Sequence, residues 1–341
     1  MSDFVNTIDL LGDDAVTTML VEGTITEYKD NIITRLGFMA FYGCKEMVSV
    51  DLPNVTSLLI DDYGGNFFKG CLKLKNVNMP LLQAIGTSSF EECTSLVSVD
   101  FPLVTKISSR AFYHCTSLEN VNLPLLAGYG RNQQNFFTGC TSLRSVSFPL
   151  LTSLQSTMFN YCTSLESVDV PKVTSIAGSA FSGCTSFTSA DFPIVTSLGN
   201  SAFKDCTSLV RVNLPLWDPN SPTSSVFQNC SSLPSIDLPK VARIGTSMFS
   251  GCTVLKTVIL RVTSVCSLSS VNAFDKTPFA SGGTGGTVLV PASQVAGYTT
   301  HTNWSAILAQ NANNRVLALE DYTVDGTITG EIDWDKLNGG N

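Results

Sequence analysis

The sequence has 341 residues, of which 43% are hydrophobic and 14% are charged, and its net charge is −8 with a pI of about 4.8. The charged share lies well below the ~25% of average proteins, so Ser, Thr and Asn must supply most of the surface polarity. Nucleic-acid binding needs clustered Lys and Arg, and an anionic membrane would repel an acidic chain. We therefore expect neither nucleic acid nor membrane as a partner.

Residues 1–33 precede the first regular motif and are expected to cap the N-terminal end of the fold. Their apolar residues are compatible with helices, with a break at Gly12-Asp13-Asp14. The apolar residues are Phe4, Ile8, Leu10, Leu11, Val16 and Met19. The first seven residues contain no basic region and no long apolar run, which predicts no Sec-type signal peptide. No stretch of the sequence approaches the length of a transmembrane helix.

A repeat of 22 residues begins near residue 34 and is visible first in the cysteines. Most consecutive cysteines are 22 residues apart, and three longer intervals correspond to insertions of five, three and two residues. The periodic cysteines are Cys44, Cys71, Cys93, Cys115, Cys140, Cys162, Cys184, Cys206, Cys230 and Cys252. An odd total of 11 and a regular period indicate a repeat, not a disulfide framework.

Phenylalanine and proline follow the same period. A phenylalanine stands three residues before each periodic cysteine, and a proline stands nine residues after it until Arg261 takes that place. The unit reads A-F-x-x-C-T-S-L-x-S-V-D-L-P-x-V-T-S-I. Alternation predicts a short strand in which Val99 and Phe101 share the inner face, while Ser98 and Asp100 face outward. The proline marks the end of the strand because it cannot donate a ladder hydrogen bond.

One such unit cannot bury its own apolar face, but parallel stacking of units builds continuous columns of Leu, Val, Ile and Phe. With strands about 4.8 Å apart, ten units predict a body roughly 50 Å long. The expected fold is an α/β repeat solenoid of about ten to eleven 22-residue repeats over residues 34–285. It should carry a parallel β-sheet on one face, a cap at each end, and form a single domain.

This unit resembles the BspA-like (Treponema-type) leucine-rich repeats of bacterial surface proteins, over about residues 34 to 285. The resemblance implies a protein that adheres to host proteins or to other cells, acting from the cell surface. A second resemblance, to leaderless proteins of gut-bacterial prophage regions, implies a virion-associated location instead. Both implications concern presentation of a surface and not catalysis.

Residues 286–318 are expected to form the C-terminal cap. Phe274 keeps the phenylalanine position, while Thr277 replaces the cysteine. A glycine-rich loop over 281–286 precedes a final strand at 287–290, and a capping helix is predicted over 292–313. This arrangement resembles the usual end of such arrays. The acidic stretch 319–341 contains Asp325-Gly326, which predicts a hairpin, and it either docks back on the fold or serves as a tether.

The cysteine column predicts neither a catalytic nor a metal centre. Equivalent side chains of a parallel stack point the same way, so buried free thiols are expected instead of disulfides. Zinc needs four ligands that converge on one point, whereas a column spreads them along a line. His114 adjoins Cys115, but adjacent strand residues face opposite sides, and His301 lies in the terminal cap. We therefore expect no enzymatic activity, no metal and no cofactor.

Two outward rows of polar side chains are the first candidate binding surface, on a sheet that we expect to be concave. One row contains Asp51, Asn78, Asp100, Asn122, Ser147, Asp169, Asp191, Asn213, Asp237 and Ile259, and the neighbouring row includes Arg211. Asp169 and Asp191 are expected to lie at strand spacing and to repel each other, a strain that a cation or a basic partner group would relieve. Such rows suit a protein or glycan ligand. The alternative is a solvated polar face without a partner.

Three insertions between repeats are the second candidate, because insertions form loops that often bind partners. They contain Tyr63, Tyr129, Arg131 and Trp217. Tyrosine and tryptophan are typical contact residues. For each aromatic residue the alternative is packing over the adjoining repeat, and Trp217 stands where other repeats have valine.

The sequence therefore favours a non-enzymatic scaffold that binds a protein or glycan through its concave sheet and edge loops. The alternative is a structural component of a phage particle or another assembly, docked through its termini. The candidate binding residues are Asp100, Asn122, Asp169, Asp191, Asn213, Asp237, Arg211, Tyr63, Tyr129, Arg131 and Trp217.

Overall fold

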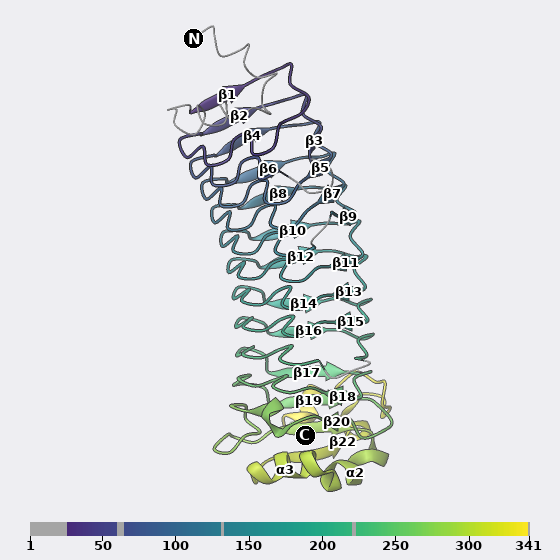
Figure 1. The fold of residues 1–341 in the computed structure, drawn as a ribbon. Coiled ribbons are helices and arrows are strands. Elements are labelled where there is room, and N and C mark those ends of the chain that lie inside the picture. The colour runs from purple at the N-terminus through teal and green to yellow at the C-terminus, as the bar shows by residue number, and fades with distance from the viewer. Residues whose placement is uncertain (1–25, 60–64, 131–132, 220–222, 340–341) are drawn as a thin grey trace. The chain divides into compact units, whose positions relative to one another are not determined.

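The structure, a computed structural model, describes residues 26–59, 65–130, 133–219 and 223–339. The helices expected between Phe4 and Met19 lie outside these residues. The chain divides into two compact units: unit 1 comprises the described residues up to Val173 with Gly183–Thr185, and unit 2 comprises Thr174–Ser182 and the described residues from Ser186. Both units are stacks of the same short repeat, so the predicted parallel-stranded solenoid is confirmed (Figure 1).

In unit 1 each repeat contributes one three-residue strand to what we call the first sheet. These strands are β1 (Glu27–Lys29), β2 (Ser49–Asp51), β4 (Asn76–Asn78), β6 (Ser98–Asp100), β8 (Asn120–Asn122), β10 (Ser145–Ser147) and β12 (Ser167–Asp169). The pairing is parallel and aligns equivalent residues, as Val99 with Val121. The valine points inward and the residues on both sides face outward, as predicted for Ser98 and Asp100. The ladder already begins at β1, before residue 34.

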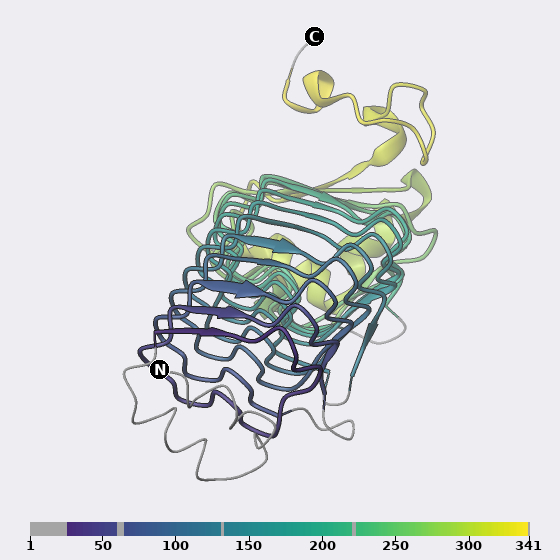
Figure 2. The same cartoon turned by 90° about the horizontal axis from the view of Figure 1, so that it is seen from above.

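A second parallel sheet, which the sequence did not predict, is formed along another side of each stack, with one short strand from most repeats. Its two-residue strands come from the V-T-S-I part of the unit. In unit 1 they are β3 (Ser57–Leu58), β5 (Ala84–Ile85), β7 (Lys106–Ile107), β9 (Gly128–Tyr129) and β11 (Ser153–Leu154). Each repeat of unit 1 is therefore one turn of a coil with two strand-bearing sides, as the view along the coils shows (Figure 2).

Unit 2 continues the same pattern and ends differently. Its first-sheet strands are β14 (Ser189–Asp191), β16 (Arg211–Asn213), β17 (Ser235–Leu238), β19 (Thr257–Leu260), β21 (Thr287–Val290) and β22 (Arg315–Ala318). Its second-sheet strands are β13 (Ser175–Ile176), β15 (Ser197–Leu198), β18 (Arg243–Ile244) and β20 (Ser267–Leu268). The last four strands of the first sheet pair in the order β17-β19-β21-β22, all parallel.

Among the described residues, the helices lie in the C-terminal part of unit 2. They are the 3₁₀ helices η2 (Val271–Phe274), η3 (Ala292–Gln294) and η4 (Leu319–Tyr322), and the α-helices α2 (Val295–Thr300), α3 (Thr302–Gln310) and α4 (Trp334–Leu337). The predicted helix over 292–313 is split at His301, whose backbone is extended (φ −67°, ψ 130°). Beyond it, β22 adds a strand that was not predicted. Helix α2 packs on this strand, whereas α3 packs on α2 and η2.

The core of each unit contains a column of stacked phenylalanine rings. In unit 1 the rings from Phe41 to Phe159 follow one another with centroids 5.0 to 5.7 Å apart. In unit 2 the rings from Phe181 to Phe249 are 5.3 to 6.0 Å apart. The planes are nearly parallel within each column, and each ring is buried between its neighbours. Burial of large aromatic side chains in this way supplies much of the stabilisation of a repeat stack.

All eleven cysteines are free and buried. Nine thiols donate a hydrogen bond to the backbone oxygen of the phenylalanine one repeat back, as Cys71 Sγ does to Phe41 O at 3.0 Å and Cys252 Sγ to Phe227 O at 3.0 Å. Burial raises the pKa of the Cys93 thiol well above its usual range. The column predicted from the sequence therefore bonds to the backbone of the preceding repeat.

In each repeat with a periodic cysteine, two residues have a left-handed backbone. The first stands five residues before the cysteine and the second stands directly before it. In one repeat these residues are Asn135 (φ 59°) and Gly139 (φ 75°). Glycine occupies the second position in several repeats because it adopts positive φ without steric cost. At Tyr161 the same φ of 58° is imposed on a large side chain, which costs about 1 kcal/mol or more.

Candidate binding surface

The outward row of unit 1 forms a ladder of side-chain hydrogen bonds along the first sheet. Asn122 Nδ2 donates to Asp100 Oδ1 at 2.7 Å, and Ser147 Oγ donates to Asp169 Oδ2 at 2.7 Å. Parallel register produces these pairs because it places equivalent residues of neighbouring repeats side by side. Three predicted site residues, Asp100, Asn122 and Asp169, therefore lie on one exposed face and already have partners there.

Asp51, at the start of the same row, shows what such pairing does to a carboxylate. Lys29 Nζ lies 2.7 Å from Asp51 Oδ2, and Asn78 Nδ2 donates to Asp51 Oδ1 at 2.7 Å. The hydrogen bond from Lys29, followed by that from Asn78, lowers the pKa of the Asp51 carboxyl. Asp51 is thus held in its ionised form by the neighbours on both sides of it in the row.

In unit 2 the outward row contains Asp191, Asn213 and Asp237. Asn213 Nδ2 donates to Asp191 Oδ1 at 2.7 Å. Asp191 and Asp169 belong to different units, and each accepts a hydrogen bond from a neutral neighbour within its own unit. Asp237 instead pairs with Arg261, which donates to both carboxylate oxygens through Nε and Nη2 at 2.7 to 3.1 Å.

The two aromatic loop candidates that the structure describes, Trp217 and Tyr129, do not join this surface. Trp217 is completely buried, with its ring 6.2 Å from Phe227 in an edge-on arrangement, so it packs in the core and is removed from the binding candidates. Tyr129 is part of β9; its hydroxyl donates to the Ser153 carbonyl and its ring packs on Phe136. Burial raises the pKa of the Tyr129 hydroxyl. Tyr63 and Arg131 lie outside the described residues.

The acidic C-terminal stretch docks against the first sheet of unit 2, outside the repeat coil (Figure 2). Leu319, Ile332 and Leu337 pack on Ile259 and Leu289 of β19 and β21. These two strand residues stand at the outward position that is polar in most other repeats. The apolar departure of the outward row is therefore explained by the segment that covers it, over residues 319–339.

Arg261 fixes this segment in place. Besides its bidentate pair with Asp237, its Nη1 donates to the carbonyl oxygens of Ile328 at 2.7 Å and Gly330 at 3.0 Å. Arginine suits this role because its rigid fork reaches a carboxylate and two carbonyls at once. Arg261 is the residue that breaks the proline series. This departure from the repeat, like the one at Ile259, is therefore explained by the C-terminal segment that docks there.

The hairpin predicted with its turn at Asp325-Gly326 has a different form. Thr323 and Ile332 make an isolated antiparallel bridge, which closes a wide loop instead of a two-residue hairpin. Inside it, Asp325 Oδ1 accepts hydrogen bonds from the Thr327 backbone N–H and hydroxyl, both at 2.9 Å. This side-chain turn replaces the ladder bonds that a hairpin would need.

A groove of about 710 Å³ lies between the docked segment and the first sheet of unit 2. Its sheet side contains the predicted site residues Arg211, Asn213 and Asp237. Its other side is formed by Glu331 and Trp334 of the docked segment, with Arg261 between them. The sequence analysis did not identify Glu331, Trp334 or Arg261 as candidates. The signal that could have pointed to them was the break of the repeat pattern at Ile259 and Arg261.

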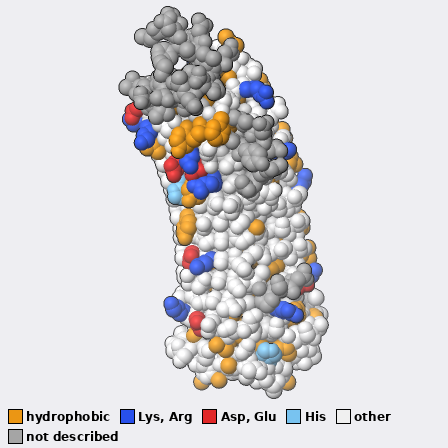
Figure 3. Space-filling view, viewed as in Figure 1, with side chains coloured by type: hydrophobic (Ala, Val, Ile, Leu, Met, Phe, Trp, Pro, Cys, Tyr) orange, Lys and Arg blue, Asp and Glu red, His pale blue; other side chains and the backbone are white. Residues whose placement is uncertain are grey.

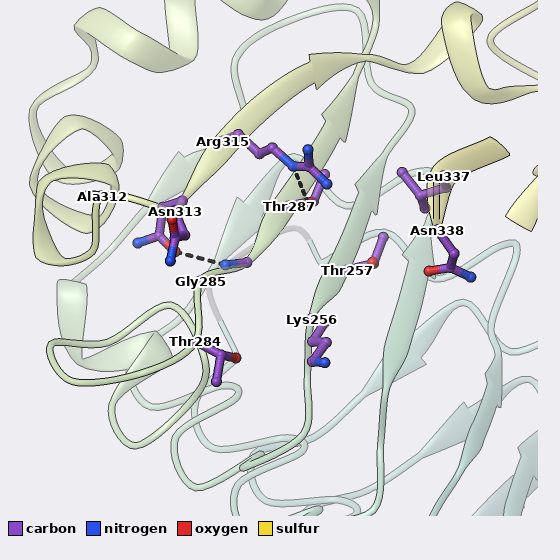
Figure 4. Close-up of a pocket in the computed structure, with 12 residues that line it drawn as sticks. Lys256, Thr257, Thr284, Gly285, Thr287, Ala312, Asn313, Arg315, Leu337 and Asn338 are labelled. Atoms are coloured by element: carbon purple, nitrogen blue, oxygen red, sulfur yellow. Dashed lines mark hydrogen bonds between the residues drawn. The ribbon is translucent and has the colours of Figure 1, made fainter. Parts of the chain in front are cut away.

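A second hollow of about 460 Å³ lies at the strand starts of the same sheet (Figure 4). Figure 4 shows Thr257, Thr287 and Arg315 on neighbouring strands, with Leu337 of α4 at one side. Arg315 Nε donates to Thr287 Oγ1 at 3.1 Å. None of the candidate residues predicted for binding lines this hollow.

A charged cluster in unit 1, also missed by sequence reasoning, is structural. Buried Glu91 accepts from Arg110 Nε at 3.0 Å and lies 3.1 Å from Lys69 Nζ, and the Arg110 guanidinium stacks 4.1 Å over the Tyr113 ring. Burial alone would raise the pKa of Glu91, but hydrogen bonds from Arg110, Ser88 and Lys69 outweigh it and lower the pKa. Elsewhere on the face seen in Figure 3, charged side chains are few and scattered.

Two kinds of feature are absent from the part of the chain that the structure describes. No three His, Cys, Asp or Glu side chains there are arranged to hold a metal ion. No helix among residues 26–59, 65–130, 133–219 and 223–339 has the length and apolarity that crossing a membrane requires.

Comparison with known proteins gives one family and several similar solved structures. The family model described as "BspA type Leucine rich repeat region" matches in six copies, over residues 24–124, 61–188 and 152–279. No curated protein matches the chain. Similar solved structures include a leucine rich cell surface protein from Faecalibacterium prausnitzii (23% identity, covering 74% of this chain and 86% of that one, TM-score 0.39). Others are a leucine-rich repeat protein from Bacteroides ovatus (21%, 78% and 87%, 0.39) and one from T. pallidum (24%, 62% and 79%, 0.31).

Proposed function

Because the chain belongs to the BspA-type leucine-rich repeat family, we propose that it is a non-enzymatic protein of the cell surface that binds a protein or glycan ligand. The ligand contacts the outward face of the first sheet. The observation that supports this most directly is the row of exposed polar side chains that parallel register aligns, such as Asp100 and Asn122. Strands hold these groups rigidly, so binding costs little conformational entropy.

The test is a binding screen of the full chain against immobilised extracellular matrix proteins and glycans, followed by two double variants. One is Asp100→Ala with Asn122→Ala in unit 1, and the other is Arg211→Ala with Asn213→Ala in unit 2. We expect at least a tenfold loss of affinity, about 1.4 kcal/mol, from one of the pairs. Lys106→Ala, an exposed change on the second sheet, is the matched control. Equal affinity of both double variants and the wild type would contradict the proposal.

Docking of the protein into a phage particle or another assembly through its termini is not favoured by any observation on the described residues. The C-terminal stretch, the expected docking point, packs on its own first sheet through Leu319, Ile332 and Leu337. A segment that is already bound within the chain offers fewer groups to a second body. We therefore propose ligand binding alone.

A further inference from the structure

The groove beside the docked segment contains two charged side chains that lack partners. Arg211 begins β16 and Glu331 lies on the docked segment; both are exposed, and no described residue pairs with either side chain. Most other charged side chains near the outward row are engaged, as Asp237 and Arg261 are with each other. Unpaired hydrogen-bonding groups on opposite walls of one groove are available to a ligand between them.

The charge of the groove is balanced. Arg211 and Arg261 supply two positive charges, and Asp237 and Glu331 supply two negative charges, so the formal sum is zero. A polyanion or a polycation would gain no net attraction from such a lining, because specificity for charged ligands depends on an excess of the opposite sign. The balance therefore favours a neutral ligand that makes many hydrogen bonds.

The groove also has an aromatic surface. Trp334 is 42% exposed, whereas Ile259 and Ile332, which also line the groove, are buried. The indole offers a flat apolar face, and polar side chains line the same groove. Such a site suits a ligand that has one apolar face and polar groups at its edge. A sugar ring has this character, since its C–H groups form an apolar face and its hydroxyls surround it. The planar groups of Arg211, Asn213 and Glu331 match pairs of adjacent hydroxyls.

We propose that this groove binds a neutral oligosaccharide, with one sugar ring on the Trp334 indole and its hydroxyls bonded to Arg211 and Glu331. This inference rests on the proposed function and gives that function a ligand class and a position. The volume of about 710 Å³ lies within the ~300–1,000 Å³ of small-ligand sites. Arg261 holds the wall that carries Glu331 and Trp334, so the groove exists before the ligand arrives.

The experiment uses the full chain on an array of neutral, sialylated and sulfated oligosaccharides, with affinities then measured by titration calorimetry up to 1 mM sugar. We expect binding of a neutral oligosaccharide. Trp334→Ala should weaken it at least tenfold, and Trp334→Phe, which keeps an aromatic face, by less than threefold. Arg211→Ala should also weaken it at least tenfold, whereas Arg243→Ala, an exposed arginine that begins β18, should leave it unchanged.

The other outcomes separate this inference from the proposed function. No binding of any sugar at 1 mM, or binding that depends on sialate or sulfate, would overturn the inference. Binding of a neutral sugar that is insensitive to Trp334→Ala and Arg211→Ala, in variants with unchanged melting temperature, would also overturn it. In each case the proposed function stands if a protein ligand is lost on changing Asp100 and Asn122, and falls if no ligand depends on the outward face.

Discussion

Removal of the Arg261 guanidinium should release the C-terminal segment from the first sheet. The side chain is only 13% exposed and donates to the carbonyls of Ile328 and Gly330. A hydrogen bond from a charged donor contributes about 1.5–3 kcal/mol. Two such bonds, reduced for partial hydration of the freed carbonyls, contribute about 3 kcal/mol to docking. Arg261→Ala should therefore raise the undocked fraction roughly 100-fold.

Native-state hydrogen exchange measures this fraction directly, since amides exchange when the segment opens locally. The informative amides are those of Val324, which donates to Glu331 O at 2.9 Å, and Asp333, which donates to Tyr322 O at 2.8 Å. Both should exchange roughly 100-fold faster in Arg261→Ala. Amides of β17 should be little affected.

Two further variants make the result decisive. Arg261→Lys keeps the charge but lacks the rigid fork, so an intermediate rate is expected. Arg243→Ala removes an exposed arginine from the second sheet and should change nothing. Less than a threefold acceleration in Arg261→Ala would refute the reasoning, because the apolar contacts of Ile332 and Leu337 would then hold the segment alone.

Three other changes test the fold. Phe137→Ala removes a buried ring between two stacked neighbours and should lower the free energy of unfolding of unit 1, measured by urea titration, by about 3–5 kcal/mol. Phe38 is exposed, so Phe38→Ala should change this free energy by less than about 0.5 kcal/mol. Similar losses in the two variants would contradict the stacked column. Burial raises the pKa of Cys252 to about 12, so the unfolded thiol, with its usual pKa near 9, loses its proton first as pH rises. Between pH 9 and pH 12 this one thiol should lower the free energy of unfolding by about 1.4 kcal/mol per pH unit, and the stability of Cys252→Ala in thermal melts should fall less steeply with pH by that amount. Ile259→Asp introduces the residue that several other repeats have at this position. Because the carboxylate would be buried beneath Leu319 and Ile332, the C-terminal segment should detach and become accessible to limited proteolysis. Unchanged cleavage would count against the docked arrangement.

The repeat itself was predictable because each position meets the same surroundings in many copies. A residue such as Val99 is identified as inward-facing by its equivalents in other repeats, and the parallel stack then follows from the need to bury those positions. The same reasoning located the strand that the structure places at Thr287–Val290, although it is not the last one, because β22 pairs beyond it.

Features shorter or more distant than the repeat were not predictable. A second-sheet strand such as Lys106–Ile107 has only two residues, too few for alternation to be visible. The breaks at Ile259 and Arg261 were apparent in the sequence, but their partners lie some seventy residues later and no periodicity connects them. Trp334 was therefore overlooked, and Trp217 was proposed as a contact although the core contains it.

The hydrogen bond from nine of the thiols to the phenylalanine carbonyl of the preceding repeat makes the repeats interchangeable modules. Each repeat inside the array supplies a donor to the repeat before it and an acceptor to the repeat after it. Cys162 Sγ, for example, donates to Phe137 O at 3.1 Å. Duplication of a 22-residue gene segment inside the array adds one donor and one acceptor together and leaves neither unsatisfied. The length of the array can thus change during evolution by whole repeats, while the docked segment over residues 319–339 is inherited unchanged.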